Sequence, residues 1–405
     1  MPAFLMLADN GSGTVSIPVA MLILFVSAKL LAEVAERLNQ PGIVGEIIAG
    51  VLIGPSVLGW LKPSEFLSAM SDLGAMFLLF RVGLEVKASE LIRVGGIATL
   101  VAFSGVVMPF IMGAFIMIFW GAPLNESIFV GAAMVATSVG ITAQVLSTKG
   151  LLHEMSSKVI LTAAVIDDVL GLLVLAVVSS LTHGRFNGLQ LALTAVLAAG
   201  FTVVVGKWGT HAIQRVKPHV ERLRAAEAHF VIALCLLFAL AGLALWTGVA
   251  AIVGAFLAGL ALAESTGSRE RDLAQGVSEF LVPFFLAGIG LQVDLSVFRQ
   301  PSTAILAIVI LVAAMISKFI GCGLGSAYLG WTEALRIGIG MIPRGEVGMI
   351  VAQIGLGFGI LSRSSYGVVV FMSVASTIVA PPLIKIAYRG SMKMNQLADE
   401  VVRVE

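Results

Sequence analysis

Long apolar runs alternate with short polar segments along almost the whole chain of 405 residues. A run of about 20 apolar residues is long enough to cross the hydrocarbon core of a bilayer as a helix. The pattern therefore predicts an all-α polytopic membrane protein with about thirteen transmembrane helices. Their expected limits are 16–36, 43–59, 66–83, 96–120, 127–147, 157–181, 189–207, 228–246, 249–264, 274–293, 303–329, 334–360 and 366–388.

The composition agrees with a membrane protein and gives no sign of a nucleic-acid partner, a metal site or a cofactor. Hydrophobic residues make up 58% of the chain and charged residues 12%, and a soluble domain could not bury that much apolar surface. The formal net charge of +1 gives no reason to expect a nucleic-acid partner. Cys235 and Cys322 lie in apolar stretches without metal-ligand spacing, and the five histidines lie in or beside connecting segments. We expect no cofactor.

The loop charges predict the orientation. With the N-terminus outside, 18 of the 25 Lys and Arg residues fall in cytoplasmic loops and four in external loops. The other three, Lys29, Lys318 and Arg344, lie within spans. Because positive charge is retained on the cytoplasmic side, residues 1–15 should form an external tail and residues 389–405 a cytoplasmic tail.

Two spans look interrupted at matching places in the two halves of the chain, on either side of the basic segment 207–229. Hydroxyl residues and Gly140 break the segment 136–142, and Pro343 with two glycines breaks the segment 342–348. Proline removes a backbone donor and glycine weakens a helix. Inverted repeats with interrupted helices are typical of transporters that bind substrate near the membrane midplane.

Charged residues within spans are costly and therefore mark candidate functional sites. Asp167 and Asp168 stand side by side inside an apolar run, and Lys318 lies deep in another. A lysine at that depth calls for a carboxylate partner. Arg344 and Glu346 lie in the second break, where they could act in ion passage or only compensate each other's charge.

These residues resemble the monovalent cation:proton antiporter-2 family, over roughly residues 17–388. The resemblance rests on five patches in order: Leu38–Glu46, Gly50–Pro55, Ala136–Thr142, Val165–Gly171 and Pro343–Gly348. It implies that Asp168 is the principal carrier of ion and proton, that Asp167 forms a salt bridge with Lys318, and that Thr137 and Ser138 line the site where the two interrupted helices cross.

The resemblance also implies a domain organisation within a membrane domain of residues 16–388. Scaffold helices over about 16–83 and 228–293 would pair two protomers in a homodimer. Core helices over about 96–181 and 303–388 would carry the ion, and a linker helix over about 189–207 would join the halves. The implied location is the bacterial inner membrane.

The expected function is secondary active transport and not enzymatic catalysis. Sodium or lithium would bind oxygen ligands at Asp168 and compete there with protons, in an electrogenic exchange by alternating access. Potassium/proton exchange is the alternative within the family, although gated potassium exchangers resemble this chain with Gln-Asp at the paired position, where this chain has Asp-Asp. A membrane sensor or a channel on the same scaffold is the alternative from another class.

Overall fold

The structure is a computed structural model that describes residues 15–38, 40–183, 196–197, 200–210, 213, 215, 228–247 and 249–391. Both expected tails lie almost entirely outside these residues. So does much of the expected linker helix 189–207, of which residues 196–197 and 200–207 are described and helical.

The first half of the chain forms seven described helices that follow the expected segments. They are α2 (Ile17–Arg37), α3 (Gly42–Ile53), α4 (Glu65–Glu85), α5 (Ala88–Phe119), α6 (Leu124–Ala133), α7 (Val139–Thr148) and α8 (Met155–His183).

The second half repeats this order of long, short and interrupted helices. Its helices are α10 (Ala228–Trp246), α11 (Ala251–Leu262), α12 (Ser268–Leu291), α13 (Pro301–Gly325), α14 (Trp331–Gly340), α15 (Glu346–Gly357) and α16 (Arg363–Ala387), with the short 3₁₀ helices η1 (Leu295–Arg299) and η2 (Ala327–Leu329) around α13. Seven helical stretches of the described residues are long and apolar enough to cross a membrane. The prediction of an all-α polytopic membrane protein is thus confirmed.

Local signals explain several helix ends. The hydroxyl of Ser64 accepts a hydrogen bond from the Leu67 amide at 3.3 Å and begins α4. Pro301 begins α13, at a position where its missing amide hydrogen costs nothing.

The expected span 43–59 is wrong in length, because α3 already ends at Ile53. Gly54 precedes a proline and therefore takes extended backbone angles.

The short helices α3 and α11 cross long helices at equivalent glycines. Gly50 and Gly259 are each the ninth residue of their helix. A Cβ atom on Gly50 would overlap the Ala287 carbonyl of α12, and one on Gly259 would overlap the Phe80 carbonyl of α4. Only glycine permits this backbone approach. The matching crossings show that the two halves are structural repeats.

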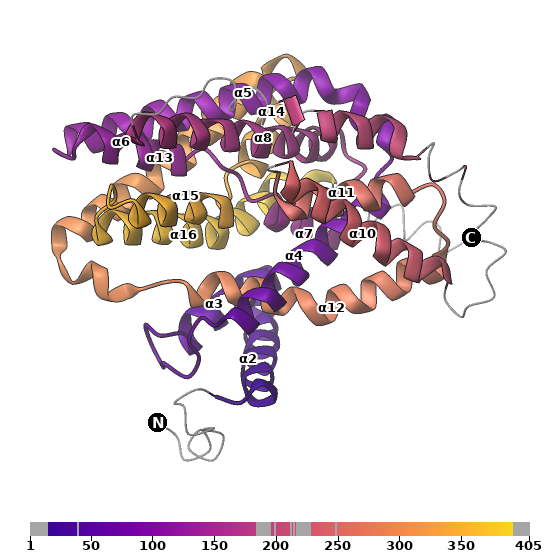
Figure 1. Cartoon of the computed structure of the whole chain (residues 1–405), viewed down its shortest axis with the longest axis horizontal. Helices are drawn as coiled ribbons and strands as arrows, with labels where there is room; N and C mark the ends of the chain where they lie inside the picture. The colour runs from indigo at the N-terminus through magenta and orange to yellow at the C-terminus, as the bar shows by residue number, and fades with distance from the viewer. Residues whose placement is uncertain are drawn as a thin grey trace.

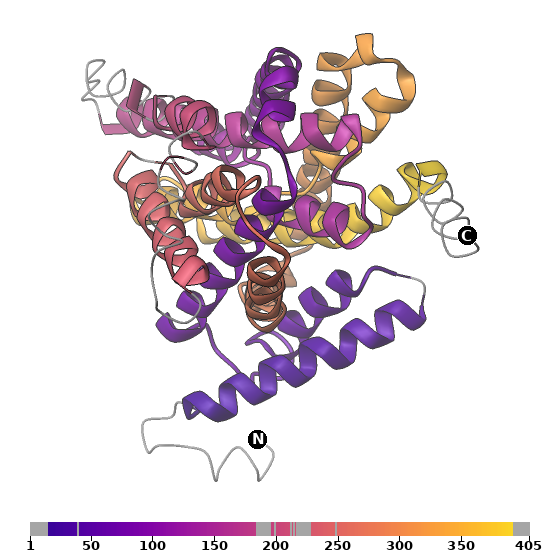
Figure 2. The ribbon, with the colours of Figure 1, turned by 90° about the vertical axis from the view of Figure 1, so that its right-hand side faces the viewer.

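The helices pack into two groups. One group contains α2, α3, α4, α10, α11 and α12, and the other contains α5 to α8 and α13 to α16. In Figure 1, α5, α8, α13 and α14 lie at the top, α2, α3 and α12 at the bottom, and α15 and α16 between them. In Figure 2, seen from the side, α2 and α3 lie at the bottom, apart from the upper helices. The groups meet where α16 packs on α3 and α7 packs on α4.

Candidate functional site

The two helix breaks lie against each other in the second group. The Ser138 amide donates a hydrogen bond to the Pro343 carbonyl at 2.8 Å, and the Thr142 hydroxyl donates to the Gly340 carbonyl at 2.7 Å. A Cβ atom on Gly345 would lie 2.6 Å from the Cβ and Oγ atoms of Ser138, so glycine is needed for this approach. Each break thereby satisfies backbone groups that the other leaves open, as buried irregular backbone requires.

Arg344 binds the carbonyl end of the half-helix α6. Its Nη1 atom donates to the carbonyls of Val135 at 2.8 Å and Ala136 at 3.2 Å, and its Nη2 atom donates to Ala314 of α13 at 2.9 Å. The Arg344 amide donates to the Ser376 hydroxyl at 3.0 Å. Val135 and Ala136 lie in the break after the end of α6, where buried carbonyls need donors from other parts of the structure. The buried guanidinium satisfies them and joins both breaks to α13.

Glu346 begins α15, but its side chain lies outside what the structure describes. An ion pair between Arg344 and Glu346 therefore stays a prediction. The contacts of Arg344 with backbone carbonyls are a role that sequence reasoning missed, since a carbonyl acceptor leaves no signal in the residue type.

Asp167 and Lys318 form a fully buried ion pair between α8 and α13. The Lys318 Nζ atom lies 2.9 Å from Oδ1 and 3.1 Å from Oδ2 of Asp167. It also donates to the carbonyls of Gly105 and Val135, each at 2.8 Å. Gly105 admits the lysine, because a Cβ atom there would lie 3.4 Å from Nζ and 2.6 Å from the Cys322 sulfur. All three ammonium protons thus have acceptors, as a buried charge requires.

Asp168 follows Asp167 on α8 and points about 100° further around that helix. Its side chain is 2% exposed. α8 packs against both α6 and α7, the helices that flank the first break. In that break the hydroxyls of Thr137 and Ser138 are buried, and neither has a hydrogen-bond partner in the structure. The helix with the paired aspartates thus lies beside buried oxygen atoms that remain open to a further ligand.

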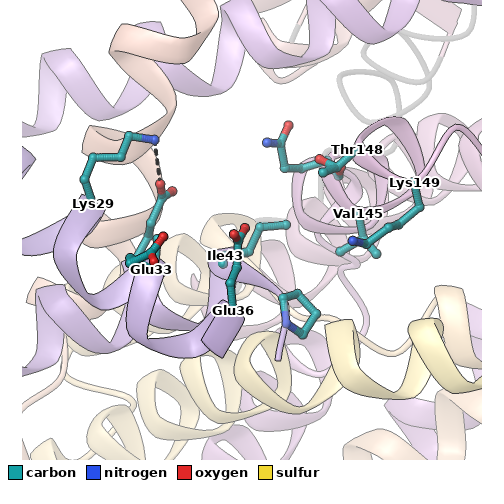
Figure 3. A pocket seen from close by; sticks show the side chains of 12 residues that line it. Lys29, Glu33, Glu36, Ile43, Val145, Thr148 and Lys149 are labelled. Carbon is teal, nitrogen blue, oxygen red and sulfur yellow. Dashed lines mark hydrogen bonds and ion pairs between the residues drawn. The ribbon is translucent and has the colours of Figure 1, made fainter. Parts of the chain in front are cut away.

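Two of the cavities that border both helix groups lie near the end of α7 and near the start of α4. The first, of about 330 Å³, is lined by the end of α2, the start of α3 and the end of α7. Figure 3 shows Glu33 and Glu36 on one wall and Thr148 and Lys149 on the other. Glu46 lies buried in this wall and pairs with Lys29 at 2.9 Å.

The second cavity, of about 550 Å³, is lined by the start of α4, the end of α12, and residues of α15 and α16. The end of α2 and the start of α4 lie at opposite ends of the intervening helix α3, so the two cavities open toward opposite sides.

Close packing separates the two cavities. Gly140, near the start of α7, faces the Phe285 ring of α12 and the Leu79 side chain of α4. A Cβ atom on Gly140 would lie 3.3 Å from the ring and 3.6 Å from Leu79. Phe285 and Leu79 are both buried. Gln144, one turn further along α7, lines the first cavity, and Gly288, three residues after Phe285, lines the second.

Comparisons with known proteins agree with this architecture. A family model described as "Sodium/hydrogen exchanger, transmembrane" matches residues 21–389. The chain is 34% identical to the high-affinity Na⁺/H⁺ antiporter NhaS3 of Synechocystis, over 92% of this chain and 90% of that protein. It is 32% identical to the Na⁺/H⁺-K⁺ antiporter GerN of Bacillus cereus, over 92% and 96%. In structure it is similar to the sodium proton antiporter MjNhaP1 of Methanocaldococcus jannaschii, with a TM-score of 0.73 and 18% identity over 95% and 99% of the two chains.

Proposed function

Because this chain belongs to the family of transmembrane sodium/hydrogen exchangers, we propose that it is an electrogenic antiporter that exchanges sodium ions for protons at Asp168. One observation carries the proposal: a buried aspartate pair lies beside the crossing of two interrupted helices, in the helix group that borders a cavity on either side. A carrier needs a site of this kind, enclosed and equally near both solutions.

The chemistry of the site fits a small monovalent cation. Sodium is a hard ion that prefers oxygen ligands, and a carboxylate with hydroxyls or carbonyls supplies them. Asp168 carries the ion, and the unpartnered hydroxyls of Thr137 and Ser138 complete its shell together with water. Because a proton and a sodium ion compete for the same carboxylate, binding of one releases the other.

The ion pair of Asp167 and Lys318 makes the exchange electrogenic. When sodium enters, Asp167 turns toward the ion and Lys318 gives up its proton, so two protons move for each sodium. One net charge then crosses per cycle, worth about 2.3 kcal/mol per 100 mV of membrane potential. A proton gradient and an inside-negative potential together expel sodium from the cell. Arg344 keeps its charge throughout and holds the breaks in place.

Alternating access follows from movement of one helix group against the other. α5 to α8 and α13 to α16 form the moving core, and α2 to α4 and α10 to α12 form the scaffold. The seam at Gly140 and Phe285 is closed in this structure, and Asp168 is buried. The observed state is therefore an occluded one, and a shift of the core opens the site to one cavity at a time.

The membrane placement of the protein is part of the same proposal. The chain lies in the bacterial inner membrane with its N-terminus outside and its C-terminus in the cytoplasm. Two copies pair through their scaffolds, and α2 offers the exposed apolar residues Leu22, Val26 and Leu30 on one face for this contact.

A second candidate is exchange of potassium for protons, because the relative GerN is named as a Na⁺/H⁺-K⁺ antiporter. A site built around one carboxylate could accept lithium, sodium or potassium. Channel or sensor activity is a candidate from another class, and it would not need obligatory coupling to protons.

Flux in sealed proteoliposomes tests these alternatives. The purified protein is compared with Asp168→Asn, and proton movement is recorded after addition of sodium, lithium or potassium at a series of imposed voltages. We expect sodium-driven proton movement that responds to voltage and is lost in the variant. Movement with potassium alone would favour the second candidate. Unchanged flux in the variant would show that Asp168 is not the carrier, and cation flux without proton movement would indicate a channel.

A further inference from the structure

Asp72 is an acidic residue of the membrane-spanning helix α4 that the exchange mechanism does not use. Two other acidic residues within spans, Asp167 and Glu46, are buried and paired with lysines at 2.9 Å. Asp72 differs on both points: it is exposed, and no ion pair joins it to another of the described residues. An uncompensated carboxylate at membrane depth is tolerated where it faces a water-filled cavity, and such residues commonly mark ion pathways.

The surroundings of Asp72 are those of a polar cavity between the two helix groups. Ser68, Ser71 and Asp72 of α4 line the cavity of about 550 Å³ together with Gln292 directly after α12, Gln353 of α15 and Tyr366 of α16. Each of these side chains ends in at least one oxygen atom. A hard cation prefers such ligands, and the described residues that line the cavity include no lysine or arginine.

The position of Asp72 along α4 places it between the mouth of the cavity and the closed seam. It lies seven positions after Glu65 at the start of the helix and seven positions before Leu79 at the seam. At 1.5 Å per residue, each separation is about 10 Å. The nearby ends of α4, α12 and α16 carry the loops with Lys62, Arg299 and Arg363, which the charge pattern predicts to be external.

We propose that Asp72 is a cation-recruiting site in this outer cavity, occupied by a hydrated monovalent cation before or after its binding at Asp168. The inference rests on the proposed exchange and adds a second, side-specific ion site to it. A carboxylate in a cavity raises the local cation concentration, because the surrounding low-dielectric protein focuses its field. Asp72 stays on the scaffold while the core moves, so it acts only when the carrier site faces this cavity.

The test measures half-saturating sodium concentrations separately from each face, in proteoliposomes of defined orientation at low ionic strength. For Asp72→Asn we expect an increase of about three- to tenfold from the outer face, no change from the inner face, and an unchanged maximal rate. Choline chloride at about 0.5 M should remove most of the difference, because the Debye length then falls below about 5 Å.

Glu65→Gln is the matched control. It removes the same charge from the same helix at an exposed position outside the cavity lining, so we expect the half-saturating concentration to stay as in the unmodified protein. Asp72→Glu keeps the charge and should also leave it nearly unchanged. An equal effect of Asp72→Asn from both faces, an equal effect of Glu65→Gln, or no effect of Asp72→Asn would overturn the proposal.

The unmodified protein gives a second measurement in case Asp72→Asn fails to fold. Its half-saturating sodium concentration at the outer face should rise with choline chloride, and an independence of ionic strength would overturn the proposal. The two proposals fail in different ways. Absent exchange, or exchange that survives Asp168→Asn, refutes the proposed function, whereas normal exchange with an unaltered Asp72→Asn variant refutes only the role of Asp72.

Discussion

Replacing Lys318 with methionine should destabilise the protein by about 3–5 kcal/mol, because it removes one partner of a fully buried ion pair. Methionine keeps most of the length of the side chain, so the cavity left behind is small. What is lost is the charge opposite Asp167 at 2.9 Å and the donor to two carbonyls at 2.8 Å. For a chain of 405 residues, this loss corresponds to a decrease of roughly 4–6 °C in the midpoint of thermal unfolding.

The double variant Lys318→Met with Asp167→Asn isolates the charge from the hydrogen bonds. Neutralising Asp167 removes the unpaired buried charge, so the double variant should recover about half of the loss or more. The Gly105 carbonyl still lacks the lysine as donor, which costs about 1–3 kcal/mol, whereas the Val135 carbonyl keeps its hydrogen bond from Arg344. Thermal unfolding of the purified protein in one detergent, without sodium, measures all four members of the cycle.

The reasoning fails if Lys318→Met unfolds at the same temperature as the unmodified protein. It also fails if the double variant loses as much stability as the two single variants added together, since the ion pair would then contribute nothing by charge compensation. Transport by the double variant is a separate readout. Exchange through Asp168 alone should persist without a response to voltage, and a retained voltage response would contradict the proton-carrying role of Lys318.

Three further predictions follow from contacts outside this pair. Gly140→Ala should slow exchange severalfold in the flux assay with little change in unfolding temperature, because the added methyl group would lie 3.3 Å from the Phe285 ring at the seam. Gly96→Ala is the control, since its Cβ atom would meet open space, and it should leave the exchange rate unchanged. Arg344→Met removes the donor to the Ala136 carbonyl and one of the donors to each of the Val135 and Ala314 carbonyls, and should cost about 1–3 kcal/mol in thermal unfolding; a variant as stable as the unmodified protein would contradict this role. The hydrogen bond from Lys158 at 2.9 Å lowers the pKa of Glu90. The stabilisation is present above the ordinary pKa of about 4.3 and is lost as the pH falls through the lower pKa of the folded state. The small difference in unfolding temperature between Glu90→Gln and the unmodified protein should therefore disappear below about pH 4.

Much of the helix pattern and both breaks could be predicted from the sequence, because each depends on neighbouring residues. Membrane spans are visible as apolar runs, and the break at Pro343 follows from the backbone chemistry of proline and glycine. The pairing of Asp167 with Lys318 was expected from the need of a buried lysine for a carboxylate, together with the family resemblance. The length of α3 was misjudged, although Gly54 before Pro55 held the signal that ends it.

Other features depend on which helices cross, and no local pattern carries that information. The acceptors of Arg344 and Lys318 are backbone carbonyls, which every residue type has, so the sequence could not single out Val135 or Gly105. Glu46 and Asp72 look alike in the sequence as single acids within apolar segments, yet one is buried against Lys29 and the other lines a cavity. The sequence by itself determined that the protein is a membrane protein, roughly where its helical spans lie, and which charged residues lie within them, because hydropathy and backbone chemistry act locally. The tertiary structure decided which charges are compensated and which face water, because burial and ion pairing depend on contacts between helices far apart in the chain.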